Sequence, residues 1–272
     1  MKILAVSGGV DSVVMLDMLA GDDCVVAHFN HGIRSDSDED ERFVGELAEK
    51  YGLHCEHKKE NLGAGASEEL ARERRYCFLK EVATKHGGVI YTAHHADDVI
   101  ESIVINLIRG TGWRGLAPLD SPDIERPLIG MFKADIKRYA NRHGLTWRED
   151  STNTDTNYLR KRVRQTLQVQ YLQKDAVLKL YEEQKVLKKQ IDELVAGFLT
   201  PSNVYDRELF RQLDDAVALE VLRAALLQVG RSATRPQLKE FLLAIKTYKT
   251  SKKFNLPGDY LVKIHKDYFH LS

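Results

Sequence analysis

Residues 7–12 are Ser-Gly-Gly-Val-Asp-Ser, and these residue types at this spacing suit the binding of phosphate. Two adjacent glycines let the backbone turn tightly and approach a ligand, because no Cβ stands in the way. Successive N–H groups then point at an anion, and a following helix adds the partial positive charge of its N-terminus. Serine hydroxyls can donate to phosphate, and an aspartate suits Mg²⁺ that bridges phosphate oxygens. The predicted phosphate-site residues are Ser7, Gly8, Gly9, Asp11 and Ser12.

Two better-known phosphate motifs are absent. There is no G-x-x-x-x-G-K-[ST] pattern, and after Gly63-Ala64-Gly65 the chain has Glu68 where a dinucleotide fingerprint has its third glycine. The alternative for residues 7–12 is an ordinary strand-to-helix turn capped by serine. The complete six-residue string, placed between an expected strand and an expected helix, favours the phosphate site.

A second candidate site lies at 92–101, Thr-Ala-His-His-Ala-Asp-Asp-Val-Ile-Glu. Apolar residues recur through 96–108 at helical spacing, which predicts a buried stripe. We expect Asp97, Asp98 and Glu101 to lie off that stripe, at the helix start. Asp98 and Glu101 are neighbours on a helix, so they could bind a metal ion or the ammonium of an amine substrate. The alternative is that acidic residues favour the helix dipole and that the two histidines are buried partners.

Basic residues gather at three places. Arg72 and Arg75 share a helix face that suits phosphates, although a solvated helix with Glu–Arg pairs fits the same pattern equally well. Arg109 opens a glycine-rich loop, which we expect near the same sheet edge as the phosphate site. Residues 160–164, Arg-Lys-Arg-Val-Arg, could follow an RNA backbone or stabilise charge in a transition state.

The elements that must position these residues alternate along the first half of the chain. Short apolar runs predict strands at 3–6, 25–29 and 89–92, and amphipathic stretches predict helices at 13–19, 38–51, 67–86 and 96–109. This order predicts an α/β fold with a doubly wound parallel sheet. His28 and Asn30 stand at the end of the second strand, and ligands bind at the carboxyl edge of such sheets.

The pattern changes after about residue 158. Helices are expected within 159–199, 206–229 and 235–247, and a final pair of strand-like runs flanks the Leu-Pro-Gly-Asp turn at 256–259. We predict a catalytic domain at 1–170 and a smaller, mainly helical domain at 171–272.

Charge is divided unevenly although the net charge is zero. Residues 1–159 hold 19 Lys and Arg against 27 Asp and Glu, and residues 160–272 hold 21 against 13. A polyanion bound by the second part explains this asymmetry, and ordinary solvated lysines explain it equally well. Three cysteines without a C-x-x-C pair disfavour a disulfide scaffold and a cysteine metal site. Without a signal-peptide pattern or a long apolar stretch, we expect a cytoplasmic protein with no membrane partner.

Taken in order, the motifs resemble the tRNA(Ile)-lysidine synthetase family of the PP-loop ATP pyrophosphatase superfamily. The resemblance covers residues 3 to about 165 and rests on S-G-G-V-D-S, H-x-N-H-G-I-R, S-E-E-x-A-R-x-R-R-Y, A-H-H-A-D-D-x-x-E, R-G-T-G, R-P-L and E-D-S-T-N. It implies an adenine nucleotide alpha hydrolase-like fold. It also implies ligation of L-lysine to the wobble cytidine of a CAU-anticodon tRNA(Ile), through an adenylated cytidine, with ATP and Mg²⁺ and release of AMP and pyrophosphate.

The resemblance also implies roles for single residues. The residues that it implies for ATP are Ser7, Gly8, Gly9, Asp11, Ser12, His28 and Asn30, with Asp11 also holding the metal ion. Those implied for the lysine substrate are Asp98 and Glu101, and those implied for catalysis are Asp11, Arg109 and Arg162. Those implied for tRNA binding are Arg72, Arg75, Arg160 and Arg164. Lys161 departs from the family, which usually has asparagine there. A further C-terminal domain of longer members is expected to be absent.

Rival functions stay open beside this interpretation. One is another PP-loop tRNA-modifying enzyme or an amide-forming ligase, although a cluster-dependent thiolase would need paired cysteines. The other is a catalytically inactive RNA-binding relative, which the intact Asp11, Asp98, Glu101 and Arg109 disfavour. A homodimer is one assembly that the sequence allows.

Overall fold

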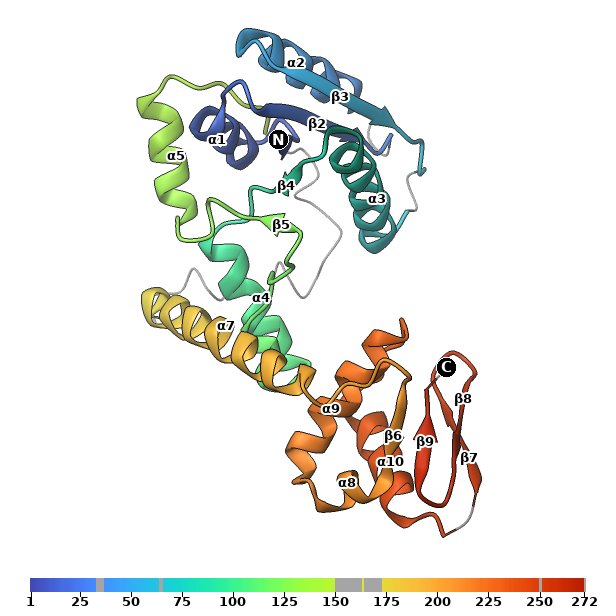
Figure 1. Cartoon of the computed structure of the whole chain (residues 1–272). Helices are drawn as coiled ribbons and strands as arrows, with labels where there is room; N and C mark the ends of the chain where they lie inside the picture. Colours follow the sequence, from blue (N-terminus) through green and yellow to red (C-terminus); the bar gives the residue numbers. More distant parts are fainter. Residues whose placement is uncertain (33–36, 64–65, 150–162, 164–172, 250, 272) are drawn as a thin grey trace. The chain divides into compact units, whose positions relative to one another are not determined.

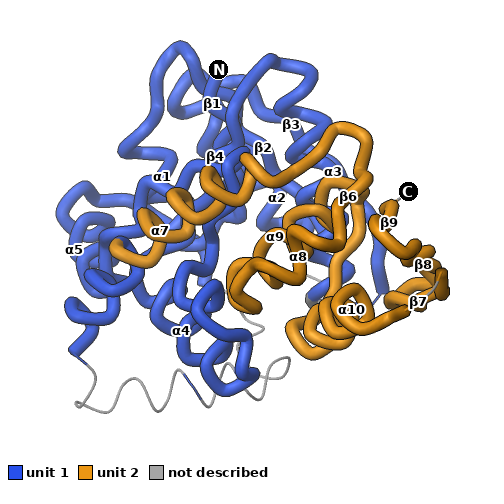
Figure 2. Tube along the Cα trace, turned by 60° about the horizontal axis from the view of Figure 1, so that its bottom comes forward, with its two compact units in different colours: residues 1–182 blue, residues 183–272 orange. Residues whose placement is uncertain are grey.

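The computed structural model describes residues 1–32, 37–63, 66–149, 163, 173–249 and 251–271. The chain forms two compact units, residues 1–182 and residues 183–272, which Figure 2 colours separately. The predicted boundary between residues 170 and 171 lies outside the described residues and stays a prediction. No helix in the described part of the chain has the length and apolar character that crossing a membrane requires.

A five-stranded parallel sheet forms the centre of the first unit, in the order β3-β2-β1-β4-β5 (Figure 1). Every neighbouring pair in it is parallel, so the strands end at one common carboxyl edge. β2 is buried at every residue, as expected of a strand covered on both faces. The strands are β1 (Lys2–Ala5), β2 (Cys24–Asn30), β3 (His54–Lys59), β4 (Val89–Tyr91) and β5 (Ile124–Glu125).

Helices cover both faces of this sheet. Ile3 of β1 packs in one hydrophobic cluster with Phe78, whereas the next residue, Leu4, packs in another with Val14 and Ile136. Because successive residues of a strand point to opposite faces, the two clusters are the two sides of the sheet. The doubly wound α/β fold is therefore confirmed. The helices are α1 (Val10–Leu19), α2 (Ser37–Lys50), α3 (Glu68–His86), α4 (Ala96–Ile108) and α5 (Lys133–Arg142), with a short 3₁₀ turn, η1 (Trp113–Leu116).

The apolar stripe predicted on α4 is correct at the start of the helix and wrong at its end. Ala96, Val99, Ile100 and Ile103 are buried, but Leu107 and Ile108 are 61% and 60% exposed. The expectation that Glu101 lies off the buried face is also wrong, because this side chain is only 3% exposed. Val99 and Ile103 form a hydrophobic cluster with Tyr181, so α7 packs against the start of α4.

The edge strand β3 is tied to the end of α3 by one carboxylate. Glu56 accepts hydrogen bonds from Lys85 Nζ (2.7 Å), His86 Nε2 (2.9 Å) and His54 Nε2 (3.0 Å). Lys85 has the largest influence, and together these donors lower the pKa of Glu56 to about 2. The contact joins β3, which pairs with β2 alone in the described part of the sheet, to a helix that packs on the sheet.

The second unit has an antiparallel sheet in the order β6-β9-β8-β7. The predicted strands around residues 256–259 are the hairpin of β7 and β8. A core that includes Phe210, Phe241 and Phe269 joins this sheet to the helices. The elements are α7 (Lys174–Ala196), which begins in the first unit, then β6 (Val204–Asp206), α8 (Arg207–Gln212), α9 (Asp215–Gln228), α10 (Arg235–Thr247), β7 (Lys252–Leu256), β8 (Tyr260–Ile264) and β9 (Tyr268–His270).

A buried guanidinium joins the parts of this second unit. Arg207 has no exposed surface, and burial lowers its pKa. It donates four hydrogen bonds of 2.7–2.9 Å to backbone carbonyls. Two acceptors are Ile245 and Tyr248, at the end of α10, and the other two are His265 and Lys266, between β8 and β9. One side chain thus satisfies buried backbone groups from two distant segments.

We predict that Arg207→Met lowers the free energy of unfolding of the second unit by about 3 kcal/mol or more, because it leaves several buried carbonyls without donors. Urea unfolding of the full chain, followed by far-UV circular dichroism, measures the change. Arg211→Met on the same helix is the control, since Arg211 makes an exposed ion pair with Glu208. Equal midpoints for the two variants would contradict the structural role of Arg207.

Candidate active site

The turn from β1 into α1 needs a glycine at position 8. Gly8 has a φ of 90°, a region that other residues rarely adopt, and a Cβ there would lie 3.3 Å from a ring carbon of Phe43. Gly9 then caps α1 in an extended conformation. The carbonyl of Gly8 accepts a hydrogen bond from the Arg148 backbone N–H at 3.0 Å. This conformation leaves the first N–H groups of α1 without helical partners, as a phosphate site requires.

The Ser12 side chain stabilises this loop through hydrogen bonds to other residues of the loop. Its buried hydroxyl donates to the Gly9 carbonyl at 2.9 Å and accepts from the Ser7 N–H at 3.2 Å. The Ser7 hydroxyl lies 3.3 Å from it. These contacts fix the shape of the loop formed by residues 7–12, and its binding of phosphate stays a prediction.

His28 presents a buried acceptor at the end of β2. Its Nδ1–H donates to the Val6 carbonyl at 2.8 Å, which fixes the neutral tautomer with a lone pair on Nε2. Burial is the main cause that lowers the pKa of His28, so the ring is uncharged at neutral pH. Nε2 is buried and has no hydrogen-bond partner among the described residues. A ligand that donates one hydrogen bond here would satisfy it.

Asn30 is occupied within the protein. Its Nδ2 donates to Asp38 at 3.0 Å and to Glu41 at 2.8 Å, and its Oδ1 accepts from the Gly32 N–H at 2.9 Å. These contacts tie the end of β2 to the first turns of α2. The side chain is only 2% exposed, and the predicted adenosine contact of Asn30 stays a prediction.

An acidic cluster surrounds the His95 ring at the carboxyl edge of the sheet. His95 Nε2 lies 3.9 Å from an oxygen of Asp11 and 3.6 Å from one of Asp98, and Nδ1 lies 3.8 Å from Asp97. Asp98 also accepts from the His95 backbone N–H at 3.0 Å, so it caps α4 as the helix-dipole alternative expected. The structure thus places the carboxylate of the second predicted site beside the phosphate loop of the first.

Two lysines that sequence reasoning missed complete this cluster. Lys133 Nζ lies 2.6 Å from both carboxylate oxygens of Asp11, and Lys174 Nζ lies 2.6 Å from Asp97. Lys133 and Asp11 are 122 positions apart, so no local spacing could have paired them. An ammonium held by both oxygens shows that Asp11 accommodates a cation. Carboxylate oxygens are ligands that Mg²⁺ prefers, so this residue fits the implied metal ion.

Asp97 positions the start of α5. Its second oxygen accepts from the Lys133 backbone N–H at 2.8 Å. Burial works to raise the pKa of Asp97, but the Lys133 N–H and the Lys174 ammonium outweigh it, and the net pKa is lowered. A surface cavity of about 650 Å³ adjoins Lys174, between the N-terminal ends of α5 and α7.

The predicted basic pair lies in a larger basic cluster around His94. Burial, followed by the positive charges of Arg72, Arg126 and Arg75, lowers the pKa of His94 to about 3. The guanidiniums of Arg72 and Arg75 lie 5.0 and 5.6 Å from the ring centre of Tyr76. Arg126 comes from the R-P-L segment after β5. The positive charges of three guanidiniums, from α3 and from the segment after β5, therefore act at His94. Whether Arg72 and Arg75 bind an anion stays a prediction.

Other predicted site residues lie away from the carboxyl edge of the sheet or outside the described residues. Arg109 caps the far end of α4, about 16 Å along the helix axis from Asp98 at 1.5 Å per residue. The expectation that its loop lies near the phosphate site is wrong in this structure. Glu101 lies one turn beyond Asp98 and is buried. Arg160, Arg162 and Arg164 lie outside the described residues.

Comparison with known proteins agrees with this geometry. Residues 2–171 match the family model of the PP-loop domain. A tRNA(Ile)-lysidine synthase of Geobacter sulfurreducens is 39% identical over 62% of this chain and 40% of its own length. Another, from Thermosipho africanus, is 30% identical over 98% of this chain and 66% of its own length.

The solved structure of a U34-tRNA thiolase from Methanococcus maripaludis has the same fold. The TM-score is 0.56 at 17% sequence identity, over 68% of this chain and 71% of that one. The chain spans about 40–52% of the length of the first three curated relatives it matches. The match over residues 2–171 includes the phosphate loop and the acidic cluster, and the chain therefore belongs to the PP-loop domain family, with tRNA(Ile)-lysidine synthases of several bacteria among its sequence relatives.

Proposed function

We propose that this protein ligates L-lysine to the wobble cytidine of a CAU-anticodon tRNA(Ile), with ATP as co-substrate. The observation that carries the proposal is the position of Asp98 beside Asp11, with His95 Nε2 3.6 and 3.9 Å from their carboxylates. It puts a carboxylate that can hold an amine next to a loop that can hold phosphates. The names of the sequence relatives support the same reaction.

The phosphates of ATP would lie on the N–H groups between Gly9 and Ser12, at the N-terminus of α1. The ammonium of Lys133 neutralises Asp11 in the structure. We propose that Lys133 turns from Asp11 to a phosphate oxygen when ATP binds, which leaves the carboxylate to hold Mg²⁺. The ion would supply charge neutralisation at the phosphates.

The adenine would lie at the end of β2. The Nε2 atom of His28 has no partner among the described residues and can only accept a hydrogen bond. The exocyclic amine of adenine can donate that bond. Asn30 contributes by holding the start of α2 rather than by touching the nucleotide.

The lysine substrate would bind through its ammonium groups at the acidic start of α4. Asp98 is the proposed partner, since Glu101 is buried one turn further along α4. The side chain of Lys174 already places an ammonium 2.6 Å from Asp97 in this cluster. The cytidine O2 would attack the α-phosphate and release pyrophosphate, and the lysine ε-amine would then displace AMP at C2. Arg162 is proposed to stabilise the developing charge. Arg109, at the far end of α4, is better placed to contact RNA.

The tRNA would meet the basic cluster of Arg72, Arg75 and Arg126, together with Arg160, Arg164 and the basic second unit. A wobble base in a single-stranded loop leaves its stack at low cost, which suits entry into such a pocket. Because elongator tRNA(Met) has the same anticodon, discrimination must use contacts outside it. We infer a cytoplasmic location, where tRNA is modified.

Labelled L-lysine should be incorporated into a CAU-anticodon tRNA(Ile) transcript in the presence of ATP and Mg²⁺. A transcript with the wobble C changed to U is the control and should stay unlabelled, because the proposed reaction adenylates cytosine and uridine carries uracil instead. Formation of AMP and pyrophosphate with some other acceptor, without lysine incorporation, would assign the chain to a sister enzyme of the PP-loop family.

Asp11→Asn and Lys133→Met should each reduce lysine incorporation about 100-fold or more, since both remove charge at the phosphates. Binding of tRNA, measured by filter retention, should be unchanged within about twofold, because neither residue contacts the RNA in this proposal. Lys137→Met, at an exposed position on the same helix as Lys133, is the control and should keep full turnover. Full activity of Asp11→Asn would refute the site.

Arg72→Ala should weaken tRNA binding and reduce the slope of log affinity against log salt by about 0.7–0.9, the value for one lost phosphate contact. Arg74→Ala is the matched control on the same exposed helix, because Arg74 is not among the main charges that act on His94. Titrations at several salt concentrations give both slopes. Equal slopes for the two variants would show that Arg72 is an ordinary solvated residue that does not contact a phosphate.

A further inference from the structure

A group of metal-binding side chains lies away from the phosphate loop. His54 and Glu56 stand two positions apart on β3, so they share one face of the strand, and His86 is the last residue of α3. β3 starts at His54, and α3 ends just before β4 begins. The group therefore lies at the amino edge of the parallel sheet, whereas the phosphate loop lies at the carboxyl edge. The proposed reaction does not use it.

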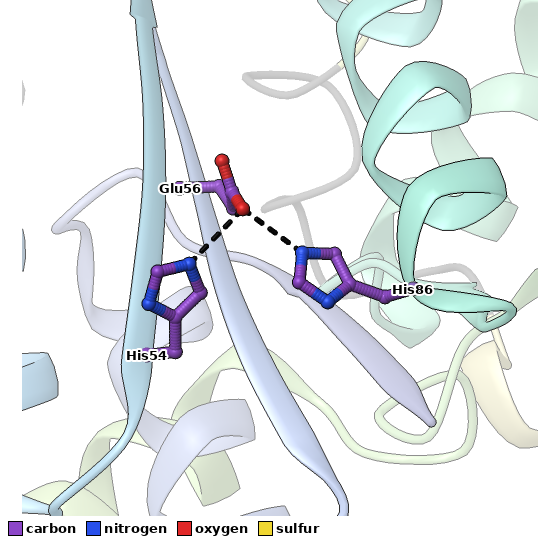
Figure 3. A group of neighbouring side chains, drawn as sticks. All are labelled: His54, Glu56 and His86. Carbon is purple, nitrogen blue, oxygen red and sulfur yellow. Dashed lines mark hydrogen bonds and ion pairs between the residues drawn. The ribbon is translucent and has the colours of Figure 1, made fainter.

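The three side chains converge on one point. Figure 3 shows both imidazole rings directing a nitrogen at the same carboxylate oxygen of Glu56. These are the Nε2 atoms, at 3.0 Å for His54 and 2.9 Å for His86. All three ligand atoms lie within 4.8 Å of one another. The rings are tilted by 49° with centroids 5.8 Å apart, so they do not stack but meet at their nitrogen edges.

This arrangement is close to what a tetrahedral zinc ion needs. Bonds of about 2.0–2.1 Å place the ligand atoms about 3.3 Å apart. The two nitrogen–oxygen distances are already slightly shorter than this value, and the exposed His54 ring can turn to bring the nitrogens closer. Two imidazoles and one carboxylate are a donor set that Zn²⁺ accepts, and hard cations such as Mg²⁺ prefer all-oxygen sets.

The side chain of Lys85 competes for this position. Its ammonium donates to the same oxygen of Glu56 at 2.7 Å. The side chain is 64% exposed on a flexible stem, so it can withdraw into solvent when a metal ion binds. Its positive charge stays near the site and weakens the binding of a cation. The affinity should therefore be moderate, with water as the fourth ligand.

We propose that His54, Glu56 and His86 form a zinc site that fastens the edge strand β3 to the end of α3. Its role is structural, because it joins two elements at the edge of the sheet farthest from the phosphate loop. A metal ion bound only by the folded chain stabilises the fold by mass action.

The test is zinc binding by the full chain without an affinity tag, measured by isothermal titration calorimetry at pH 7.5. We expect one equivalent of zinc to bind with a moderate Kd of about 1–10 µM. His54→Gln, Glu56→Gln and His86→Gln should each weaken it at least about tenfold. His57→Gln is the matched control, since His57 lies on the same strand with the same 62% exposure but outside the group. It should leave the affinity unchanged.

Two further readouts separate a metal site from a set of ordinary ion pairs. Co²⁺ bound at the three residues should give the strong visible absorption of tetrahedral coordination, and His86→Gln should abolish it. Zinc should raise the melting temperature of the wild-type chain but not of His54→Gln, whose exposed position makes misfolding of the variant a minor concern. Binding weaker than about 100 µM, or binding that the three variants leave unchanged, would overturn the proposal.

Discussion

The candidate site at the carboxyl edge of the parallel sheet depends on the left-handed turn at Gly8. A φ of 90° there lets β1 pass directly into α1, and Phe43 leaves little room for a side chain. The turn aims the free N–H groups of α1 at the carboxyl edge of the sheet, where β2 and β4 also end. His28, near the end of β2, and His95, after β4, lie at this edge because both strands run parallel to β1. A different residue at position 8 would misplace the loop that all other groups face.

Opposite charges are kept in neighbouring but separate groups at this edge. Asp11, Asp97 and Asp98 surround His95, and Lys133 and Lys174 neutralise two of these carboxylates. The basic cluster around His94 comes from α3 and the segment after β5. A site built in this way can hold a cation, an amine and a polyanion side by side. Such a set is what the proposed ligation of lysine to a tRNA would require.

The second unit relies on a different kind of interaction. Its sheet is short, and Arg207 ties the end of α10 to the turn between β8 and β9 with four hydrogen bonds. A buried charge that is fully hydrogen-bonded specifies one arrangement of the chain, because no apolar side chain could satisfy the same carbonyls. In the first unit, by contrast, the arrangement of the chain is set by the pairing of the parallel strands and by the two apolar layers on either side of the sheet.

The α/β class, the glycine-rich turn at residues 7–12 and the acidic start of α4 could be predicted from the sequence, because these depend on local spacing and on glycine at one turn. It could not reveal β3, whose residues His-Cys-Glu-His-Lys-Lys lack an apolar run, nor the two-residue β5. The burial of Glu101 and the exposure of Leu107 followed from what packs around α4, not from helical periodicity. Only the tertiary structure paired Lys133 with Asp11 and His86 with Glu56. Such contacts join segments far apart in the chain, and the folding of the sheet and helices, not their spacing, decides which of them meet.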